Sequence, residues 1–392
     1  MSFTQLASDF YGFETKLTET EREALGGLRA WLEADVEPLV NDYWDRAEFP
    51  REILPAFHAQ PVFGMQWDET RSFENSAVYR GWVALELARV DASIATYVGV
   101  QNGLALGAVA VCGSPEQRAE WLPKLADGSV IGAFGLTEPL SGSDSAQGLR
   151  TTATREGDEW VLNGSKRWIG NATFSDITVI WAKDTADGQV KGFIVPTSTP
   201  GYTATKIERK LALRIVQNAD ITLEDVRIPE SLRLQNANSF RDTAAVLRLT
   251  RAEVAWAAVG VAVGAYEAAL AYAQERVQFG KPIASHQLVQ QHLAEMIGNI
   301  TASIAMCTRV SEMLDEGTQK DEHAALAKAY ATTRMRETVA RAREVMGGNG
   351  IVLDYDVTRF FNDAEALYSY EGTREMNTLI VGRALTGKAA FV

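Results

Sequence analysis

A single carboxylate near the end of the chain has a setting that suits a general base. Glu371 follows a Tyr-rich, helix-like run ending at Tyr370, and Gly372 and Thr373 come directly after it. Burial in apolar surroundings raises the pKa of a carboxyl group, which lets it remove a proton near neutral pH. Without other support a surface-turn glutamate is the simpler interpretation, so the base is a hypothesis that other segments must strengthen.

Two further segments carry groups that could hold a ligand. The loop 136–144, LTEPLSGSD, can offer hydroxyl and backbone donors to a carbonyl-rich ring or a pyrophosphate. A domain-linking loop with Ser and Asp caps explains the same letters. Trp168 is expected on a strand, where a lone tryptophan is usually core, but Lys166 and Arg167 beside it favour a boundary position.

Neither the glycine-rich run nor the cysteines and histidines predict a nucleotide-binding motif or a metal site. The GGNG run at 347–350 follows an expected helix and is typical of a turn; it is neither a GxGxxG after a strand nor a P-loop. Cys112 and Cys307 are far apart and are expected to be reduced core thiols. The four histidines are scattered, so no metal site is predicted.

Composition excludes some functions. The 392 residues carry a formal net charge of −13, which disfavours binding to a nucleic-acid backbone. The start lacks a basic segment followed by an apolar run, so no secretory signal is expected. The alanine-rich stretch from Arg251 to Gln278 could be mistaken for a membrane span, but acidic residues interrupt it and a packed bundle helix is predicted. We therefore expect a soluble, cytoplasmic protein without membrane or nucleic-acid partners.

The pattern of elements predicts an α+β multidomain protein. An N-terminal α-helical domain is expected over residues 1–132, and a middle β domain, an antiparallel barrel or sandwich, over 133–240. A C-terminal four-helix bundle is expected over 241–392, with Arg251 opening its alanine-rich helix. Asn163-Gly164 is a hairpin signal between two of the short strands.

Five stretches, taken together and in order, resemble the acyl-CoA dehydrogenase superfamily. They are AFGLTEPLSGSD, NGSKRWIGNATFSD, ERVQFGKPIASHQL, EVMGGNGIVLDYDVTRFFND and YEGTREMNTLIVGRALTG. The likeness is strongest to the branch of glutaryl-CoA dehydrogenases and plant-type short-chain acyl-CoA oxidases. It implies the three-domain fold of that family, FAD as cofactor, an acyl-CoA substrate and a homotetramer.

The resemblance also implies roles for individual residues. Glu371 matches the catalytic base, which removes the α-proton of the acyl-CoA while the β-hydrogen leaves as hydride to flavin N5. The thioester oxygen would be held by the N–H of the base and by a ribityl hydroxyl of FAD.

Cofactor contacts are implied for Leu136, Thr137, Ser143, Trp168, Ile169, Gly170, Arg276, Gln278, Phe279, Glu344, Gly347, Gly348, Thr373 and Glu375. Arg276, Gln278 and Phe279 would reach the FAD of a neighbouring subunit. Substrate contacts are implied for Ser143, Arg251, Gly372 and Arg383; a salt bridge at the end of the bundle is the alternative role for Arg251.

Two departures from the family pattern bear on the chemistry. Gly170 stands where many relatives have Thr, which removes a hydroxyl near flavin N5. Ala95, within Ile94-Ala95-Thr96, stands where glutaryl-CoA dehydrogenases carry an Arg that pairs with the distal carboxylate of the substrate. Because a buried carboxylate without a cation is costly, we expect a short, uncharged acyl group.

Several alternatives stay open. The leading hypothesis is a dehydrogenase that passes electrons to an electron-transferring flavoprotein. A short-chain acyl-CoA oxidase that makes peroxide is the second, although the final AFV is not a peroxisomal tripeptide. A glutaryl-CoA dehydrogenase that also decarboxylates is the third. A non-catalytic flavoprotein or CoA-binding scaffold is the rival from another class; it would be signalled by loss of the base, yet Glu371 is present.

Overall fold

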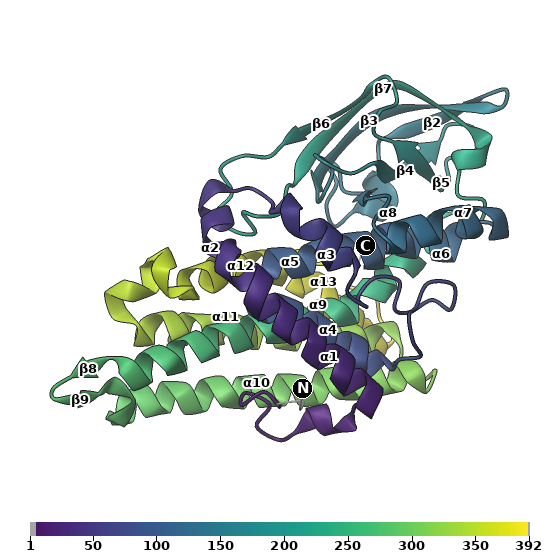
Figure 1. Cartoon of the computed structure of the whole chain (residues 1–392). Helices are drawn as coiled ribbons and strands as arrows, with labels where there is room; N and C mark the ends of the chain where they lie inside the picture. The colour runs from purple at the N-terminus through teal and green to yellow at the C-terminus, as the bar shows by residue number, and fades with distance from the viewer. Residues whose placement is uncertain (1–4, 391–392) are drawn as a thin grey trace.

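The computed structural model describes residues 5–390. Along the chain a helical part comes first, then a β sheet, then a second helical part. In space the two helical parts pack against each other and the sheet lies at one edge of them (Figure 1). The expectations about the two ends of the chain fall partly on residues 1–4 and 391–392, outside the described residues. The three-part arrangement is the predicted α+β fold. The exact domain boundaries stay predictions.

The first part is helical because its apolar residues recur at helical spacing behind good N-caps. Thr18 and Glu21 form the expected capping box of α1, and Asp91 caps α5 through its carboxylate. The helices are α1 (Glu19–Trp31), α2 (Glu37–Arg46), α3 (Leu54–His58), α4 (Ala77–Val90), α5 (Ala92–Val98), α6 (Gly107–Cys112) and α7 (Pro115–Ala126). A π-helical segment, η4 (Gly99–Leu106), joins α5 to α6 without a break.

The middle part is one curled sheet, and it is mixed rather than wholly antiparallel as predicted. Its strands are β1 (Gly132–Gly135), β2 (Thr152–Glu156), β3 (Glu159–Ile169), β4 (Ile177–Asp184), β5 (Val190–Pro196), β6 (Tyr202–Lys206) and β7 (Ala219–Pro229). The order is β1-β4-β2-β3-β7-β6 with β5 on β4, and β4 runs parallel to both β1 and β2. A short helix, α8 (Ser145–Gly148), lies in the loop before β2.

The predicted hairpin at Asn163-Gly164 is wrong. These residues lie inside β3, where the pairing with β7 shifts register between Leu162 and Gly164. The actual turn joins β2 to β3 through Gly157-Asp158, and Gly157 has a φ of 64°. The glycine at 164 is needed because a Cβ there would collide with the backbone of Thr151.

The last part is built around one long helix, α9 (Phe240–Glu275), which packs against α4, α10, α11 and α12. Arg251 therefore lies three turns inside α9 and does not open it; a capping box of Ser239 and Asp242 does. The other helices are α10 (Gln287–Asp315), α11 (Asp321–Val345), α12 (Val357–Ser369) and α13 (Arg374–Thr386). Between α9 and α10 the two-residue strands β8 (Val277–Gln278) and β9 (Lys281–Pro282) form a hairpin at one end of the molecule (Figure 1).

Two helical stretches are long and apolar enough to cross a membrane, α9 and the continuous run Ala92–Cys112. The sequence interpretation singled out only α9. In each, 72% of the most apolar window is buried inside the protein. The two stretches thus have the burial of core helices, which accounts for their composition.

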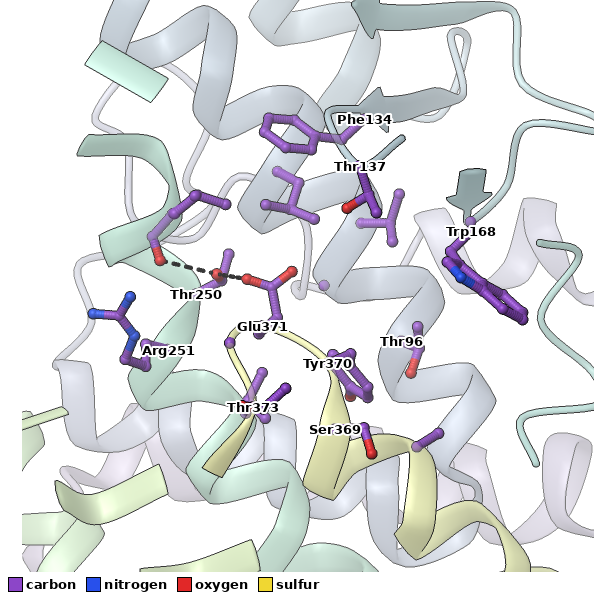
Figure 2. A pocket seen from close by; sticks show the side chains of 18 of the residues that line it. Thr96, Phe134, Thr137, Trp168, Thr250, Arg251, Ser369, Tyr370, Glu371 and Thr373 are labelled. Carbon is purple, nitrogen blue, oxygen red and sulfur yellow. Dashed lines mark hydrogen bonds between the residues drawn. The ribbon is translucent and has the colours of Figure 1, made fainter. Parts of the chain in front are cut away.

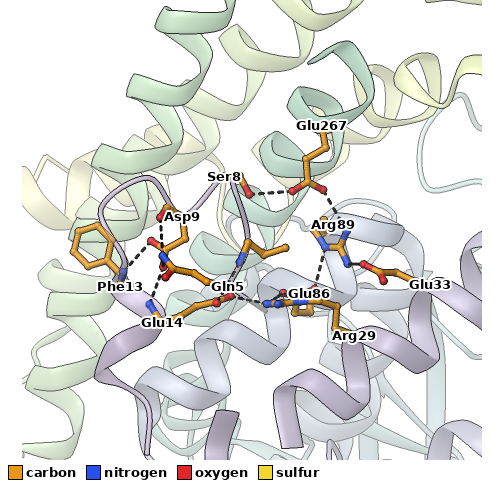
Figure 3. Close-up of polar contacts among 11 residues, drawn as sticks. Gln5, Ser8, Asp9, Phe13, Glu14, Arg29, Glu33, Glu86, Arg89 and Glu267 are labelled. Carbon is orange, nitrogen blue, oxygen red and sulfur yellow. Dashed lines mark hydrogen bonds and ion pairs between the residues drawn. The ribbon is translucent and has the colours of Figure 1, made fainter. Parts of the chain in front are cut away.

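Buried ion pairs fasten the N-terminal segment to the helical core (Figure 3). Arg29 of α1 contacts Glu14 at 2.5 Å and Glu86 of α4 at 2.6 Å. Arg89 links Glu86 at 2.9 Å to Glu267 of α9 at 3.2 Å. Because each charge has an opposite neighbour, the network can persist in a low-dielectric environment and tie together segments distant in sequence.

Candidate active site

A cavity of about 930 Å³ lies where the sheet, η4, α9 and the loop after α12 meet. Ten of the residues singled out from the sequence line it: Leu136, Thr137, Ser143, Trp168, Ile169, Gly170, Arg251, Glu371, Gly372 and Thr373. In Figure 2 the carboxyl group of Glu371 points into the cavity, with Arg251 on one side and Thr137 and Trp168 on the other. Segments more than 200 residues apart in sequence thus share one site.

Glu371 has the environment of a weakly acidic carboxyl group. Its Oε2 accepts a hydrogen bond of 2.8 Å from the hydroxyl of Thr250. Burial raises the pKa of Glu371, while the Thr250 hydrogen bond and the charges of Lys328 and Arg251 lower it in part. A carboxylate with a raised pKa is a stronger base, which suits proton abstraction near neutral pH.

The backbone around Glu371 is held in an uncommon conformation. Glu371 has a φ of 52° and Gly372 a φ of 80°. The buried ammonium of Lys328 donates to the carbonyls of Tyr370 and Gly372, and the Asn377 side chain donates to Gly372 at 2.8 Å. These bonds give both carbonyls partners within the protein. Among the described residues the N–H of Glu371 has no acceptor, so it is free to donate to a ligand.

The loop 136–144 is fixed by a buried ion pair. Lys166, fully buried on β3, donates to Glu138 at 2.8 Å and to the Leu136 carbonyl at 3.2 Å. The Glu138 carboxylate also accepts from the N–H groups of Arg150 and Thr151 at 2.7 and 2.9 Å. Lys166 therefore holds the loop that presents Thr137 and Ser143.

Trp168 offers a flat apolar surface to the cavity. It remains 51% exposed although it follows the fully buried Lys166 by only two positions. Its φ is 65°, a strained value for a bulky residue, and Asn218 donates to its carbonyl at 3.2 Å. The guanidinium of Arg167 lies 4.9 Å from the ring centre. An exposed aromatic face held in this way suits stacking with a planar ring.

Gly170 borders the same surface. A Cβ at Gly170 would lie 3.2 Å from Cγ2 of Val100 on η4, so a larger residue there requires Val100 to shift. η4 thus closely approaches the sheet at the position where the sequence resemblance leads to an expected Thr.

Eight predicted contact residues lie away from the cavity within one chain: Arg276, Gln278, Phe279, Glu344, Gly347, Gly348, Glu375 and Arg383. All eight are exposed. Phe279, at the tip of the β8–β9 hairpin, is 95% exposed and has a φ of 52°. A single subunit does not bring these residues to the site.

Arg251 is not used in a bundle salt bridge. No acidic group within the described residues lies within ion-pair distance of it, and its buried Nε has no hydrogen-bond partner. Burial lowers the pKa of Arg251, and the charges of Asp321 and Glu371 oppose that shift. An unpaired cation on the cavity wall indicates a site for an anionic or carbonyl group.

Four residues with a place in the site were not predicted as such. Thr250 and Lys328 hold Glu371 and its loop, Lys166 holds the loop 136–144, and Glu253 lines the cavity. For Lys166, Glu253 and Lys328 the sequence signal was a charge inside a helix or strand pattern, which does not identify its partner, and Thr250 gave no signal.

Family models for acyl-CoA dehydrogenases match nearly the whole chain: the N-terminal domain at residues 18–129, the middle domain at 133–226 and the C-terminal domain at 240–386. The chain therefore belongs to the acyl-CoA dehydrogenase family. Membership makes it a flavin-dependent oxidoreductase.

The relatives include enzymes named for different acyl-CoA substrates. Two crystal structures of glutaryl-CoA dehydrogenase from Mycobacterium smegmatis are similar to this chain over 99% of its length and 100% of theirs. The first has a TM-score of 0.94 and 38% sequence identity. The second, in complex with FADH2, has a TM-score of 0.95 and 35% identity. The short-chain specific acyl-CoA dehydrogenase of Mus musculus is 35% identical over 93% of this chain and 90% of its own length. The Caffeyl-CoA reductase-Etf complex subunit CarC of Acetobacterium woodii is 32% identical over 89% of this chain and 93% of its own length.

Proposed function

We propose that the protein catalyses α,β-dehydrogenation of a short-chain acyl-CoA to the trans-2-enoyl-CoA, with Glu371 as the base. One observation carries the proposal: a carboxyl group with a raised pKa faces a large cavity, opposite an exposed tryptophan. This arrangement provides a base on one side of a bound acyl group and a surface for a planar electron acceptor on the other.

The chain's own residues account for the proton transfer. Glu371 takes the α-proton onto its carboxylate, and Thr250 stabilises the ionised form before the reaction. The free N–H of Glu371 would donate to the thioester oxygen, where negative charge develops as the proton leaves. Lys328 donates to the neighbouring carbonyls, and its positive charge offsets their negative ends.

The cavity residues fit FAD. Trp168 offers a stacking face, Thr137 and Ser143 offer hydroxyls, and Leu136, Ile169 and Gly170 lie on the same wall. When bound, FAD supplies the acceptor for the hydride that leaves the β-carbon. We place Thr373 at the same cofactor, and the exposed Glu375 beside its adenosine end.

The outlying residues are proposed to act between subunits. The exposed Arg276, Gln278 and Phe279 would reach the FAD of a neighbouring chain, with Glu344, Gly347 and Gly348 near its adenosine half. This role requires at least a dimer, and a homotetramer fits the family. Arg251, Gly372 and Arg383 are proposed to contact the CoA portion, with Ser143 also on the substrate side.

We infer that the acyl group lacks a distal carboxylate. Ala95, which stands where glutaryl-CoA dehydrogenases have an Arg, lines the cavity. Of the other cavity cations, Lys210 already donates to three oxygens at 2.6–2.7 Å, and Arg248 lies 3.6 Å from Asp321. Glutaryl-CoA dehydrogenase activity is the second candidate, favoured by the high TM-scores; the unpaired Arg251 is the group that would have to replace the missing cation.

Electron transfer to an electron-transferring flavoprotein is proposed for reoxidation, since a relative belongs to such a complex. Anaerobic mixing of the purified protein with butyryl-, hexanoyl- and glutaryl-CoA, repeated in air with peroxide detection, tests these proposals. Bleaching of the flavin by the neutral acyl-CoAs with little peroxide supports a short-chain dehydrogenase. Rapid bleaching by glutaryl-CoA with CO₂ release contradicts the substrate proposal, and peroxide at each turnover indicates an oxidase.

A further inference from the structure

The cavity contains a second carboxyl group that the proposed reaction does not use. Glu253 lies on α9, three residues after Thr250, and lines the same cavity as Glu371. Within the described residues its carboxyl group makes no hydrogen bond and no ion pair. A polar group in such a position costs free energy unless a ligand or water satisfies it.

The wall of η4 beside Glu253 leaves room for its carboxyl group. A Cβ on Gly103 of η4 would lie 3.3 Å from Oε2 of Glu253 and 2.7 Å from Cγ2 of Thr250. The absence of a side chain at Gly103 therefore makes the space that both residues occupy. Apolar side chains of two helices line this cavity as well: Ala84 and Leu87 of α4, and Val254 and Ala257 of α9.

The charges near Glu253 do not neutralise it. Arg80 on α4 is the cation whose charge acts on the pKa of Glu253. Its guanidinium, however, already donates to Asn75 and lies 3.7 Å from Asp315. Burial and the charge of Glu371 raise the pKa of Glu253 to about 7, and Arg80 opposes the rise. At neutral pH the group can therefore accept a hydrogen bond in either protonation state.

We propose that Glu253 is a specificity-determining residue that selects acyl groups carrying a hydrogen-bond donor, a hydroxyl or an amine, beyond the β-carbon. The inference rests on the proposed function, because it assigns the cavity between η4 and α9 to the acyl group. A donor on the acyl chain satisfies the unpaired carboxyl, a methyl group leaves it unsatisfied, and a distal carboxylate adds a like charge.

Binding to a turnover-free variant tests this separately from catalysis. On a Glu371→Gln background, calorimetry compares 5-hydroxypentanoyl-CoA with hexanoyl-CoA, which replaces the hydroxyl by a methyl group, and with glutaryl-CoA. We expect the hydroxyacyl-CoA to bind at least about tenfold more tightly than hexanoyl-CoA, the size of one well-made buried hydrogen bond. Adding Glu253→Leu should remove or reverse that preference, whereas Glu253→Gln, which still accepts a hydrogen bond, should keep it.

Glu365→Gln is the matched control, because Glu365 also lines the cavity but its carboxylate is paired with Arg336 at 2.8 Å. It should leave the preference unchanged. Equal affinities for the hydroxyacyl- and hexanoyl-CoA, or a preference that survives Glu253→Leu, would overturn the inference even where the wild type bleaches with acyl-CoAs. If no acyl-CoA bleaches the wild-type flavin while the Glu253-dependent preference holds, the proposed function fails and the selectivity stands.

Discussion

The hydroxyl of Thr250 on α9 donates a 2.8 Å hydrogen bond to the carboxylate of Glu371, 121 residues later in the chain. This bond fixes one oxygen of the proposed base and stabilises its ionised form. It also places the base against the central helix of the last helical part, whose next turn carries Glu253.

Glu371→Gln should slow flavin bleaching by any acyl-CoA by about 10²–10⁴-fold while the protein stays yellow. The amide keeps the size of the side chain but cannot take a proton, and general-base catalysis is worth about 10²–10⁴-fold. Stopped-flow absorbance of the flavin measures the rate. A variant that reduced its flavin at a near wild-type rate would show that another group is the base.

Thr250→Val should shift the acid limb of the kcat/KM pH profile to higher pH. The hydrogen bond from Thr250 lowers the pKa of Glu371, so its removal leaves that pKa higher still and leaves less of the base ionised at a given pH. Thr250→Ser keeps the hydroxyl and should restore the profile. Identical profiles for the wild type and the Val variant would mean that the bond does not tune the base.

Lys166→Met should destabilise the protein by about 3–5 kcal/mol, because it leaves the buried Glu138 carboxylate without its cation. Burial lowers the pKa of Lys166 to about 8, and the charge of Glu138 and its hydrogen bond oppose that shift. Thermal unfolding with and without added FAD measures the loss. The double variant Lys166→Met/Glu138→Gln should recover part of the lost free energy of unfolding. A loss in the double variant equal to the sum of the losses in the two single variants would show that the two residues are not coupled.

The contribution of Glu14 to the free energy of unfolding should fall as pH rises from 4.5 to about 7. Burial raises the pKa of Glu14 from 4.5 to about 7, with Arg29 opposing the rise, so the folded state holds this proton more tightly than the unfolded state. The contribution is therefore present below the unfolded pKa and is lost as pH rises through the folded one. Urea unfolding at several pH values compares the wild type with Glu14→Gln, whose stability should vary less over this range. Parallel curves would assign the slope to other groups.

Ala95→Arg should raise the affinity for glutaryl-CoA without a matching gain for hexanoyl-CoA, because it places a cation on the cavity wall. Ala95→Gln adds comparable bulk without charge and should not improve glutaryl-CoA binding. Calorimetry with both ligands measures the effect. A wild type that already prefers glutaryl-CoA would instead point to Arg251 as the substitute cation.

Much of the fold was predictable because it follows from local patterns. The capping box at Thr18 and Glu21 and the strand runs around β3 and β4 appear in the structure close to where the sequence predicts them. The hairpin at Asn163-Gly164 was not predictable correctly, since an Asn-Gly pair fits both a turn and a bulge, and only the register with β7 distinguishes the two. The parallel pairings of β4 likewise depend on partners that are distant in sequence.

The sequence by itself determined the family, the α+β architecture and Glu371 as the candidate base, because ordered motifs and periodicity are properties of the chain alone. Only the tertiary structure decided that Thr250 and Lys328 hold that base, that Lys166 is buried against Glu138, and that Glu253 lies unpaired in the cavity. The physical reason is that burial and charge pairing arise between segments separated by tens to hundreds of residues. The residue type shows that a side chain can ionise, but its pKa and its partners depend on the residues packed around it.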